Sequence, residues 1–409
     1  MKVLRLSIAL SLLCSLGFGT QETEDSLEGY ISANKQEYFR LEGEKIESSS
    51  DMLRDSWIAP IMLQYSHGVS EAYDNKSTTK RTSISIDQPI FQSGGIYFGI
   101  KFAEASRAYG EYSLESAKRK LIKDAISLLM QVRQSDLKIQ KQNLLIKNAA
   151  INLEFKKEQY LSGQLDSTFL DDAIVERNSA KQVLIDIEAA KQRLLSQLRV
   201  ISDVAYESVA LPRLELLEEE SFYANNIAYE QAKSESEKNY YAKNMTVAKY
   251  LPQISLNAAY NWDKIENFNV GGSSVGATER KTDYWTYGFK ASIPLNINTF
   301  DDMQTTRVEY LQSKVLEQDK KREIKAVYEQ VIQNIERFDK KIALSRENQE
   351  IYEKLLNDTK ELFAAGYKTE YDVALLANSL AIQKLDVAIA ELDRQLELLT
   401  LYETAANEI

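Results

Sequence analysis

The chain has 409 residues, and its net charge of −11 and pI near 5.0 argue against nucleic acid as a partner, because an acidic surface repels phosphate. Charged residues make up 27% of the chain, too many for a helical membrane protein. A single histidine, His67, and a single cysteine, Cys14, exclude disulfide frameworks and Cys/His zinc sites. We therefore expect no metal and no cofactor.

Residues 1–19 have the pattern of a secretory signal peptide. Lys2 and Arg5 form the basic start, an apolar run covers 6–16, and Gly17 and Gly19 provide the small residues of a cleavage site. This run is too short to cross a bilayer as a helix. No later segment has 18 consecutive apolar residues. We therefore expect an exported protein that is either soluble or a β-barrel.

An internal duplication organises the rest of the chain. The charged run at 115–120 recurs at 317–322, and the glycine turns at Gly163 and Gly366 keep a similar offset. The first repeat, 20–202, is predicted to contain a helix at 27–53, strands at about 57–70 and 82–92, and long helices at about 95–160 and 168–202. A linker at 203–220 precedes the second repeat, 221–409, with a helix at 222–249, strands at about 251–263 and 284–295, and long helices at about 300–362 and 369–405.

The predicted strands alternate apolar and polar residues, as Leu256 and Tyr260 alternate with Asn257 and Asn261. Their length is what a tilted strand needs to cross a bilayer. Aromatic side chains at a membrane interface are expected from six residues in or beside the strands: Trp57, Tyr65, Tyr260, Trp262, Trp285 and Tyr287. A water-soluble sandwich with an apolar core would show the same alternation, and the pattern alone gives both alternatives similar weight. The polar segments 71–81 and 264–283 are predicted as hairpin loops.

The long helices are too long for a globular core. The segment 300–362 contains neither proline nor glycine and would span about 95 Å at 1.5 Å per residue. Ile324, Tyr328, Val331 and Ile335 step by 4, 3 and 4, the spacing of a coiled-coil seam. Four strands cannot close a barrel, and an open sheet edge is not tolerated in lipid. A membrane barrel therefore needs several copies, and a wide pore needs at least three.

The layout resembles the outer membrane efflux protein family, the TolC-like channel-tunnels. The segments 88–95, 250–254, 292–295 and 365–373 carry this resemblance, which covers essentially the whole mature chain. It implies a homotrimer with a twelve-stranded outer membrane barrel and a twelve-helix periplasmic tunnel in a Gram-negative bacterium. It further implies docking to a periplasmic adaptor (a membrane fusion protein) and an inner-membrane pump. The implied activity is passive export in a tripartite efflux or type I secretion system, without catalysis.

Two groups of site residues follow from the resemblance. Members of the family close the tunnel tip with acidic rings, and the matching residues here are Asp372 in the second repeat and Asp171 with adjacent Asp172 in the first. Three symmetry-related carboxylates at a constriction attract cations. With equal weight, the pairs Thr168–Asp171 and Thr369–Asp372 serve only as helix N-caps. The adaptor is expected to contact the turns, at Ser162, Gly163, Gln164, Ala365, Gly366 and Tyr367.

A different class of function fits the same long helices. An exported coiled-coil structural or adhesin-like protein with a β head would share the signal peptide and the helices but would not transport anything. The strand pattern and the duplication favour the channel. No Walker loop, GxSxG or HExxH motif occurs in the sequence, so we expect no enzyme.

Overall fold

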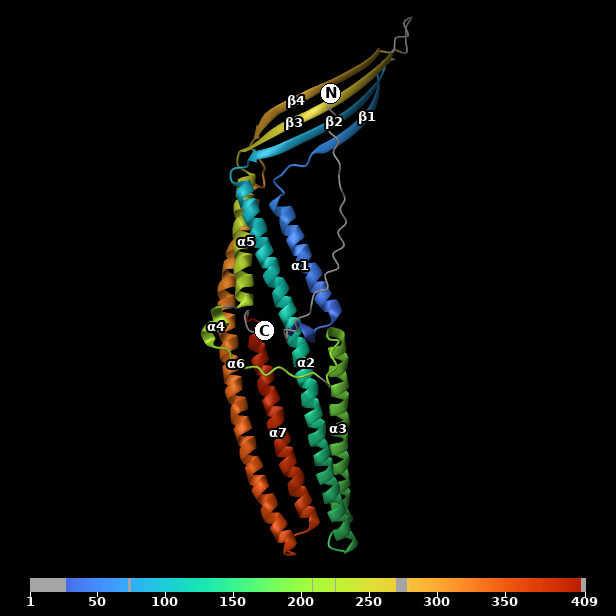
Figure 1. Cartoon of the computed structure of the whole chain (residues 1–409), viewed down its shortest axis with the longest axis vertical. Helices are drawn as coiled ribbons and strands as arrows, with labels where there is room; N and C mark the ends of the chain where they lie inside the picture. Colours follow the sequence, from blue (N-terminus) through green and yellow to red (C-terminus); the bar gives the residue numbers. More distant parts are fainter. Residues whose placement is uncertain (1–26, 73–74, 208, 225, 270–277, 406–409) are drawn as a thin grey trace, which may run out of the picture.

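The molecule is long and narrow, with a β-sheet at one end and the turns of two helical hairpins at the other (Figure 1). The computed structural model describes residues 27–72, 75–207, 209–224, 226–269 and 278–405. The predicted signal peptide lies outside the described residues. The described chain is mainly helical with one small antiparallel sheet, as the sequence predicts.

The two repeats contain the same order of elements. The first consists of the 3-10 turn η1 (Leu27–Tyr30), α1 (Ala33–Arg54), β1 (Met62–Ala72), β2 (Asn75–Phe91), α2 (Gly95–Leu161) and α3 (Ser167–Ile201). The second consists of α4 (Glu219–Ala224), α5 (Ile227–Lys249), β3 (Gln253–Asn269), β4 (Thr278–Ser292), α6 (Thr299–Ala364) and α7 (Glu370–Tyr402). Each repeat therefore supplies one strand hairpin, one helix of about 22 residues beside it and one long helical hairpin.

The sheet has the order β1-β2-β3-β4, with every neighbouring pair antiparallel. Its register places the apolar residues of all four strands on one face. Leu63 lies opposite Ile84, which lies opposite Tyr260, which lies opposite Trp285. Directly paired residues share a face, so the period-two patterns of four separate segments combine into one apolar surface. The opposite face carries mainly polar residues such as Ser83 and Asn261.

The strands are longer than the sequence predicts, and the expected loops at 71–81 and 264–283 are largely strand. β2 and β3 each have 17 residues. The polarity of these segments suggested loops, but their charged side chains pair across strands. The Arg81 guanidinium donates to both carboxylate oxygens of Asp263 at 2.8 and 3.1 Å. At the other end, β1 begins at Met62 rather than at 57, so Trp57 lies before the strand.

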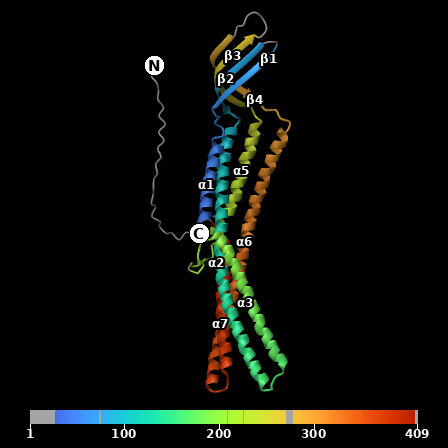
Figure 2. The ribbon, with the colours of Figure 1, turned by 90° about the vertical axis from the view of Figure 1, so that its right-hand side faces the viewer.

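The helices pack side by side, and the turns of the two helical hairpins lie at the end of the molecule away from the sheet (Figure 2). Near the sheet the order across this helical layer is α1-α2-α5-α6, and towards the tip it is α3-α2-α7-α6 (Figure 1). α2 and α6, of 67 and 66 residues, run the whole length of the layer. Within the described chain, α7 therefore packs between α2 and α6, and α3 packs mainly on α2.

The main apolar core lies halfway along the molecule, where the upper and lower helices meet. It joins η1, α2, α6 and the end of α7, with Ile126, Met130, Val331 and Leu398 almost fully buried. The predicted linker at 203–220 is packed into this core through Leu214 and Leu217. The Gln395 side chain binds both the N–H and the carbonyl of Leu214. The segment 203–220 therefore connects the two repeats by packing into their shared core.

Candidate functional site

The two turns at the tip have the same backbone design. Gly163 and Gly366 follow the last residues of α2 and α6 and adopt left-handed φ values of 73° and 81°. The N–H of Gln164 donates to the Gln159 carbonyl at 2.9 Å, and the N–H of Tyr367 donates to the Leu362 carbonyl at 2.8 Å. These bonds define Schellman motifs, which require a residue in the left-handed region and therefore favour glycine. Ser162, Gly163, Gln164, Ala365, Gly366 and Tyr367 are all exposed on these turns.

Exposed apolar side chains surround both turns. Tyr367 is 80% exposed and Leu161, the last residue of α2, is 73% exposed. Phe169 on α3 and Phe363 on α6 are also exposed. Leu161, Phe169 and Phe363 lie two, six and three residues from the glycine of their turn and are not among the contact residues predicted from the sequence. The tip offers an apolar surface of a kind that marks protein contact sites.

The acidic residues of the tip have different roles in the two hairpins. Thr369 caps α7 in a reciprocal capping box: its N–H donates to the Asp372 carboxylate at 2.9 Å, and the Asp372 N–H donates to the Thr369 hydroxyl at 3.2 Å. The Thr369 hydroxyl also donates to the Asp372 carboxylate at 2.9 Å. The two hydrogen bonds that this carboxylate accepts, from the Thr369 N–H and then from its hydroxyl, lower the pKa of Asp372. The carboxylate is therefore ionised at neutral pH.

The predicted cap pair of the first hairpin is wrong. The N-cap of α3 is Asp166, whose side chain accepts from the Thr168 N–H at 2.8 Å. The acidic side chain two residues upstream takes the capping position that the sequence analysis gave to Thr168. Asp171 and Asp172 are exposed on α3. Within one chain they do not meet Asp372, because α2 lies between α3 and α7 (Figure 1).

Tyr371 is a tip residue that the sequence analysis missed. Its hydroxyl donates to a carboxylate oxygen of Glu158 on α2 at 3.2 Å, which joins the first turn of α7 to the last turns of α2. The Glu158 carboxylate raises the pKa of the Tyr371 hydroxyl, so this donor keeps its proton. The two residues are 213 positions apart, and no local pattern in the sequence connects them.

A ladder of polar pairs continues along the contact between α2 and α7. The Asn378 amide donates to the Asn148 side chain at 2.8 Å, Lys141 pairs with Asp386 at 2.6 Å, and the Gln134 amide donates to Asp393 at 2.5 Å. Successive rungs lie seven residues apart on α2 and eight and seven residues apart on α7. Polar pairs at heptad spacing fix the register of two packed helices. α7 is thus held to α2 at a defined height from the tip upwards.

The predicted interfacial aromatics divide into two groups. Tyr65, Tyr260, Trp262, Trp285 and Tyr287 lie on the apolar face of the sheet, where Tyr260 packs against Trp262 and Trp285 with ring centroids 4.4 and 4.6 Å apart. Trp57 is separate, in the segment between α1 and β1.

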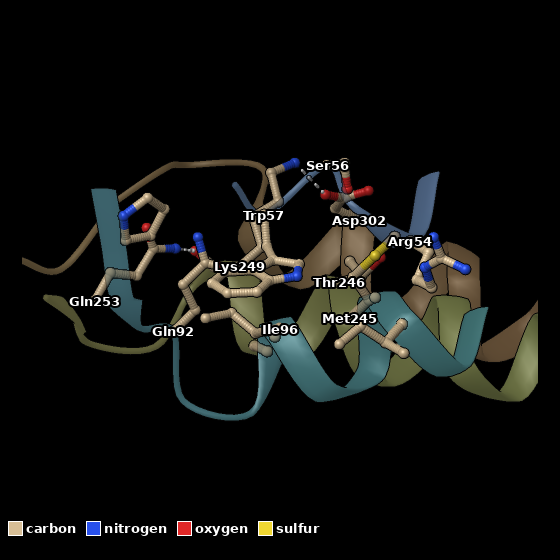
Figure 3. A pocket seen from close by; sticks show the side chains of 15 residues that line it. Arg54, Ser56, Trp57, Gln92, Ile96, Met245, Thr246, Lys249, Gln253 and Asp302 are labelled. Atoms are coloured by element: carbon tan, nitrogen blue, oxygen red, sulfur yellow. Dashed lines mark hydrogen bonds and ion pairs between the residues drawn. The ribbon is translucent and has the colours of Figure 1, made fainter. Parts of the chain in front are cut away.

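Trp57 lines a pocket of about 470 Å³ where the sheet joins the helices. Figure 3 shows its indole ring lying across Gln92 and Ile96, with Arg54 and Met245 at the far end. Lys249 of α5 pairs with Asp302 of α6 at 3.2 Å, and the Tyr250 hydroxyl donates to the same carboxylate at 2.6 Å. Polar and apolar side chains both line this pocket. Among its described lining residues, the Lys249–Asp302 pair is the only ion pair that joins two elements, α5 and α6. No group of three or more potential metal ligands occurs among the described residues.

Comparison with known proteins places this architecture. No family model matches the sequence, and no curated protein matches it. The outer membrane channel CmeC of Campylobacter jejuni superposes with a TM-score of 0.70 at 11% identity, over 94% of this chain and 86% of that chain. The outer membrane protein VceC of Vibrio cholerae superposes with a TM-score of 0.71 at 13% identity, over 94% of this chain and 96% of that chain. The resemblance predicted from the sequence is confirmed at the level of the fold: this chain has the fold of the TolC-like outer membrane efflux channels.

Proposed function

We propose that three copies of this chain form a passive exit duct through the outer membrane and periplasm of a Gram-negative bacterium. The three sheets close a barrel of twelve strands, and the three helical layers close a tunnel of twelve helices. The duct docks to a periplasmic adaptor and an inner-membrane pump, in a tripartite efflux or type I secretion system. It moves its cargo without catalysis.

The observation that carries this proposal is that the molecule is open at both edges along its whole length. Among the described strands, β1 and β4 each pair on one side only. An unpaired strand edge with an apolar face cannot remain exposed in lipid. Pairing β4 of one copy with β1 of the next satisfies both edges. Two copies would give a barrel of eight strands, which side chains fill, whereas three give twelve and leave a water-filled lumen.

The helical layer supports the same closure. Towards the tip, α3 and α6 form its two edges, and each has exposed apolar side chains: Val175 and Ile185 on α3, and Leu344, Ile351 and Leu355 on α6. Contact between α6 of one copy and α3 of the next would bury apolar side chains of both helices. By length and mean hydropathy alone, α7 could also cross a membrane. We assign it to the tunnel instead, because the polar ladder that binds it to α2 would have to be broken in lipid.

The sheet end of the molecule suits the membrane end of a duct, and the hairpin tip suits its periplasmic end. The apolar face of the sheet with its aromatic residues suits contact with lipid. Trp57 lies at the end of the sheet nearer the helices, where the other membrane interface would be. The exposed apolar side chains around Gly163 and Gly366 offer the adaptor a contact surface at the tip. Asp372, and Asp171 with Asp172, would form acidic rings there in a trimer.

Electron microscopy of the protein purified in detergent from the outer membrane fraction tests the proposal. We expect a trimeric cylinder well over 100 Å long with a detergent belt at one end, and large conductance in planar bilayers. A soluble rod without a belt, or absence from the membrane fraction, would contradict it.

Single-channel recording tests the acidic ring separately. Asp372→Ala should raise the conductance and weaken block by multivalent cations, because it removes three carboxylates from the constriction. Asp166→Ala is the matched control, since it removes an acidic helix cap from the other hairpin. If both variants behave like the parent channel, Asp372 only caps its helix.

A further inference from the structure

One row of the sheet places basic side chains on four neighbouring strands. His67 of β1 lies opposite Lys80 of β2, Lys80 lies opposite Lys264 of β3, and Lys264 lies opposite Lys281 of β4. We call these four residues the lysine row. Like charges directly opposite each other destabilise a sheet. Two successive pairings, Lys80 with Lys264 and Lys264 with Lys281, carry this cost, which points to a role outside folding.

The polar face of the same strands shows the contrast. One residue further along β2, Arg81 lies opposite Asp263 and forms a bidentate ion pair with it at 2.8 and 3.1 Å. On that face a cation meets an anion across the strands. In the lysine row, which lies on the apolar face, a cation meets a cation. Oppositely charged residues face each other on the polar side of the sheet and like-charged residues on the apolar side. This difference indicates that the two faces of the sheet contact different surroundings.

The lysine row lies at the edge of the apolar surface that is farther from the helices. Two residues before it, the row of Tyr65 and Trp262 ends the apolar surface. Two residues correspond to roughly 7 Å along a strand. If the apolar surface contacts the hydrocarbon layer, the lysine row lies at the depth of the lipid headgroups. Its distance from the helices places it on the side away from the periplasm, in the outward-facing leaflet.

Carboxylates flank the lysine row on both sides along the same face. Glu266 and Glu279 occupy the next row outward. Lys264 pairs with Glu266 at 2.5 Å and with Glu279 at 3.3 Å, Lys281 pairs with Glu279 at 2.8 Å, and Lys80 approaches Glu266 at 4.0 Å. Three lysines therefore share the two carboxylates of the outward row, and the Lys281 side chain is 73% exposed. Asp283, in the next row inward, accepts a hydrogen bond from the Tyr260 hydroxyl at 2.7 Å. Exposed ion pairs of this kind contribute little free energy, so a phosphate can take over the lysine N–H donors.

We propose that the lysine row binds the phosphate groups of lipid headgroups in the outward-facing leaflet, as a basic belt around the outside of the barrel. The inference rests on the proposed function, because it requires the sheet to form part of a membrane barrel. The belt would hold the barrel at a fixed height and surround it with phosphorylated lipid. The apolar surface beside the lysine row suits the acyl chains of a lipid. The ammonium groups of the row suit a phosphate at the end of those chains.

Binding of lipid A to the purified full-length trimer, measured by native mass spectrometry and by titration in neutral detergent, tests the inference. Each lysine near an anionic surface strengthens binding about fivefold, so K80Q/K264Q/K281Q should bind lipid A about 100-fold more weakly at low salt. K290Q is the matched control, because Lys290 lies on the opposite face of β4. It should bind as the parent protein does. K80R/K264R/K281R keeps the charge and should retain binding.

Several results would overturn the inference. The triple glutamine variant could bind lipid A as tightly as the parent, K290Q could weaken binding equally, or the parent could bind dephosphorylated lipid A as tightly as lipid A. If millimolar inorganic phosphate displaced bound lipid A as effectively as added lipid A does, the row would be a site for free anions, and the inference would also be overturned. Conductance in planar bilayers separates this inference from the proposed function. A parent trimer that forms pores but binds no lipid A refutes the inference alone, whereas a protein that forms no pore refutes both.

Discussion

The two helical hairpins share their turn but differ in how the returning helix begins. Both turns are Schellman motifs closed by a glycine, Gly163 in the first repeat and Gly366 in the second. α3 begins with a single cap at Asp166, whereas α7 begins with the reciprocal box of Thr369 and Asp372. The two repeats therefore share the turn that reverses the chain and differ in the cap of the helix that follows it.

The hairpins also differ in their attachment to α2. α7 is bonded to α2 from its second residue, through Tyr371 and Glu158. Among the described residues, the first hydrogen bond between side chains of α3 and α2 joins Glu176 to Asn152 at 3.2 Å, nine residues after α3 begins. Outward movement of the α7 tip must break this hydrogen bond, whereas the start of α3 contacts α2 through the Lys156 ammonium, which lies 5.6 Å from the centre of the Phe169 ring. If the duct opens at its tip, the second hairpin is where opening is restrained.

The largest expected effect tests what the hairpins share. Gly163→Ala and Gly366→Ala should each destabilise their turn by about 1–2 kcal/mol, the cost of a left-handed residue with a Cβ atom. A Cβ at either position would meet no atom within 4 Å, so the cost is confined to the backbone. Hydrogen exchange in the last turns of α2 and α6 measures the effect. Gly68→Ala, also in open space but without a positive φ, should change little. An effect in one hairpin only would contradict a shared design.

A smaller effect tests what the hairpins do not share. Tyr371→Phe removes the hydrogen bond to Glu158, worth about 1 kcal/mol, and should shift the balance towards an open tip about fivefold. Single-channel open probability without adaptor measures this shift. Tyr367→Phe is the control, because Tyr367 lies on the same hairpin with its side chain 80% exposed. Equal effects of the two variants would show that the bond does not restrain the tip.

Local patterns predicted the parts of the structure that depend on local geometry. The positions of Gly163 and Gly366 follow from the left-handed residue that a helix-ending turn requires. The alternation around Tyr260 and Trp285 follows from the two-residue period of a strand. Prediction of the strand ends failed, because Arg81 and Asp263 are polar and yet pair across strands. Contacts such as Tyr371–Glu158 depend on packing between distant segments, which no window of sequence contains.

The smallest effect concerns the response of the α7 start to acid. Hydrogen bonds from the Thr369 N–H and hydroxyl lower the pKa of Asp372, so the carboxylate stabilises the folded start of α7. A lowered pKa means that this stabilisation is fully present above the ordinary aspartate pKa, about 4, and is lost as the pH falls through the lowered value.

Exchange protection of the first turn of α7, corrected for the intrinsic rate, should therefore be constant down to about pH 4 and decrease below it. Asp372→Asn provides the control, since an amide can still accept the Thr369 hydrogen bonds but does not titrate in this range. Its protection should not change over the same pH interval. A parallel decrease in the parent and in Asp372→Asn would mean that another group controls the acid response, and that the capping box of α7 adds no pH dependence.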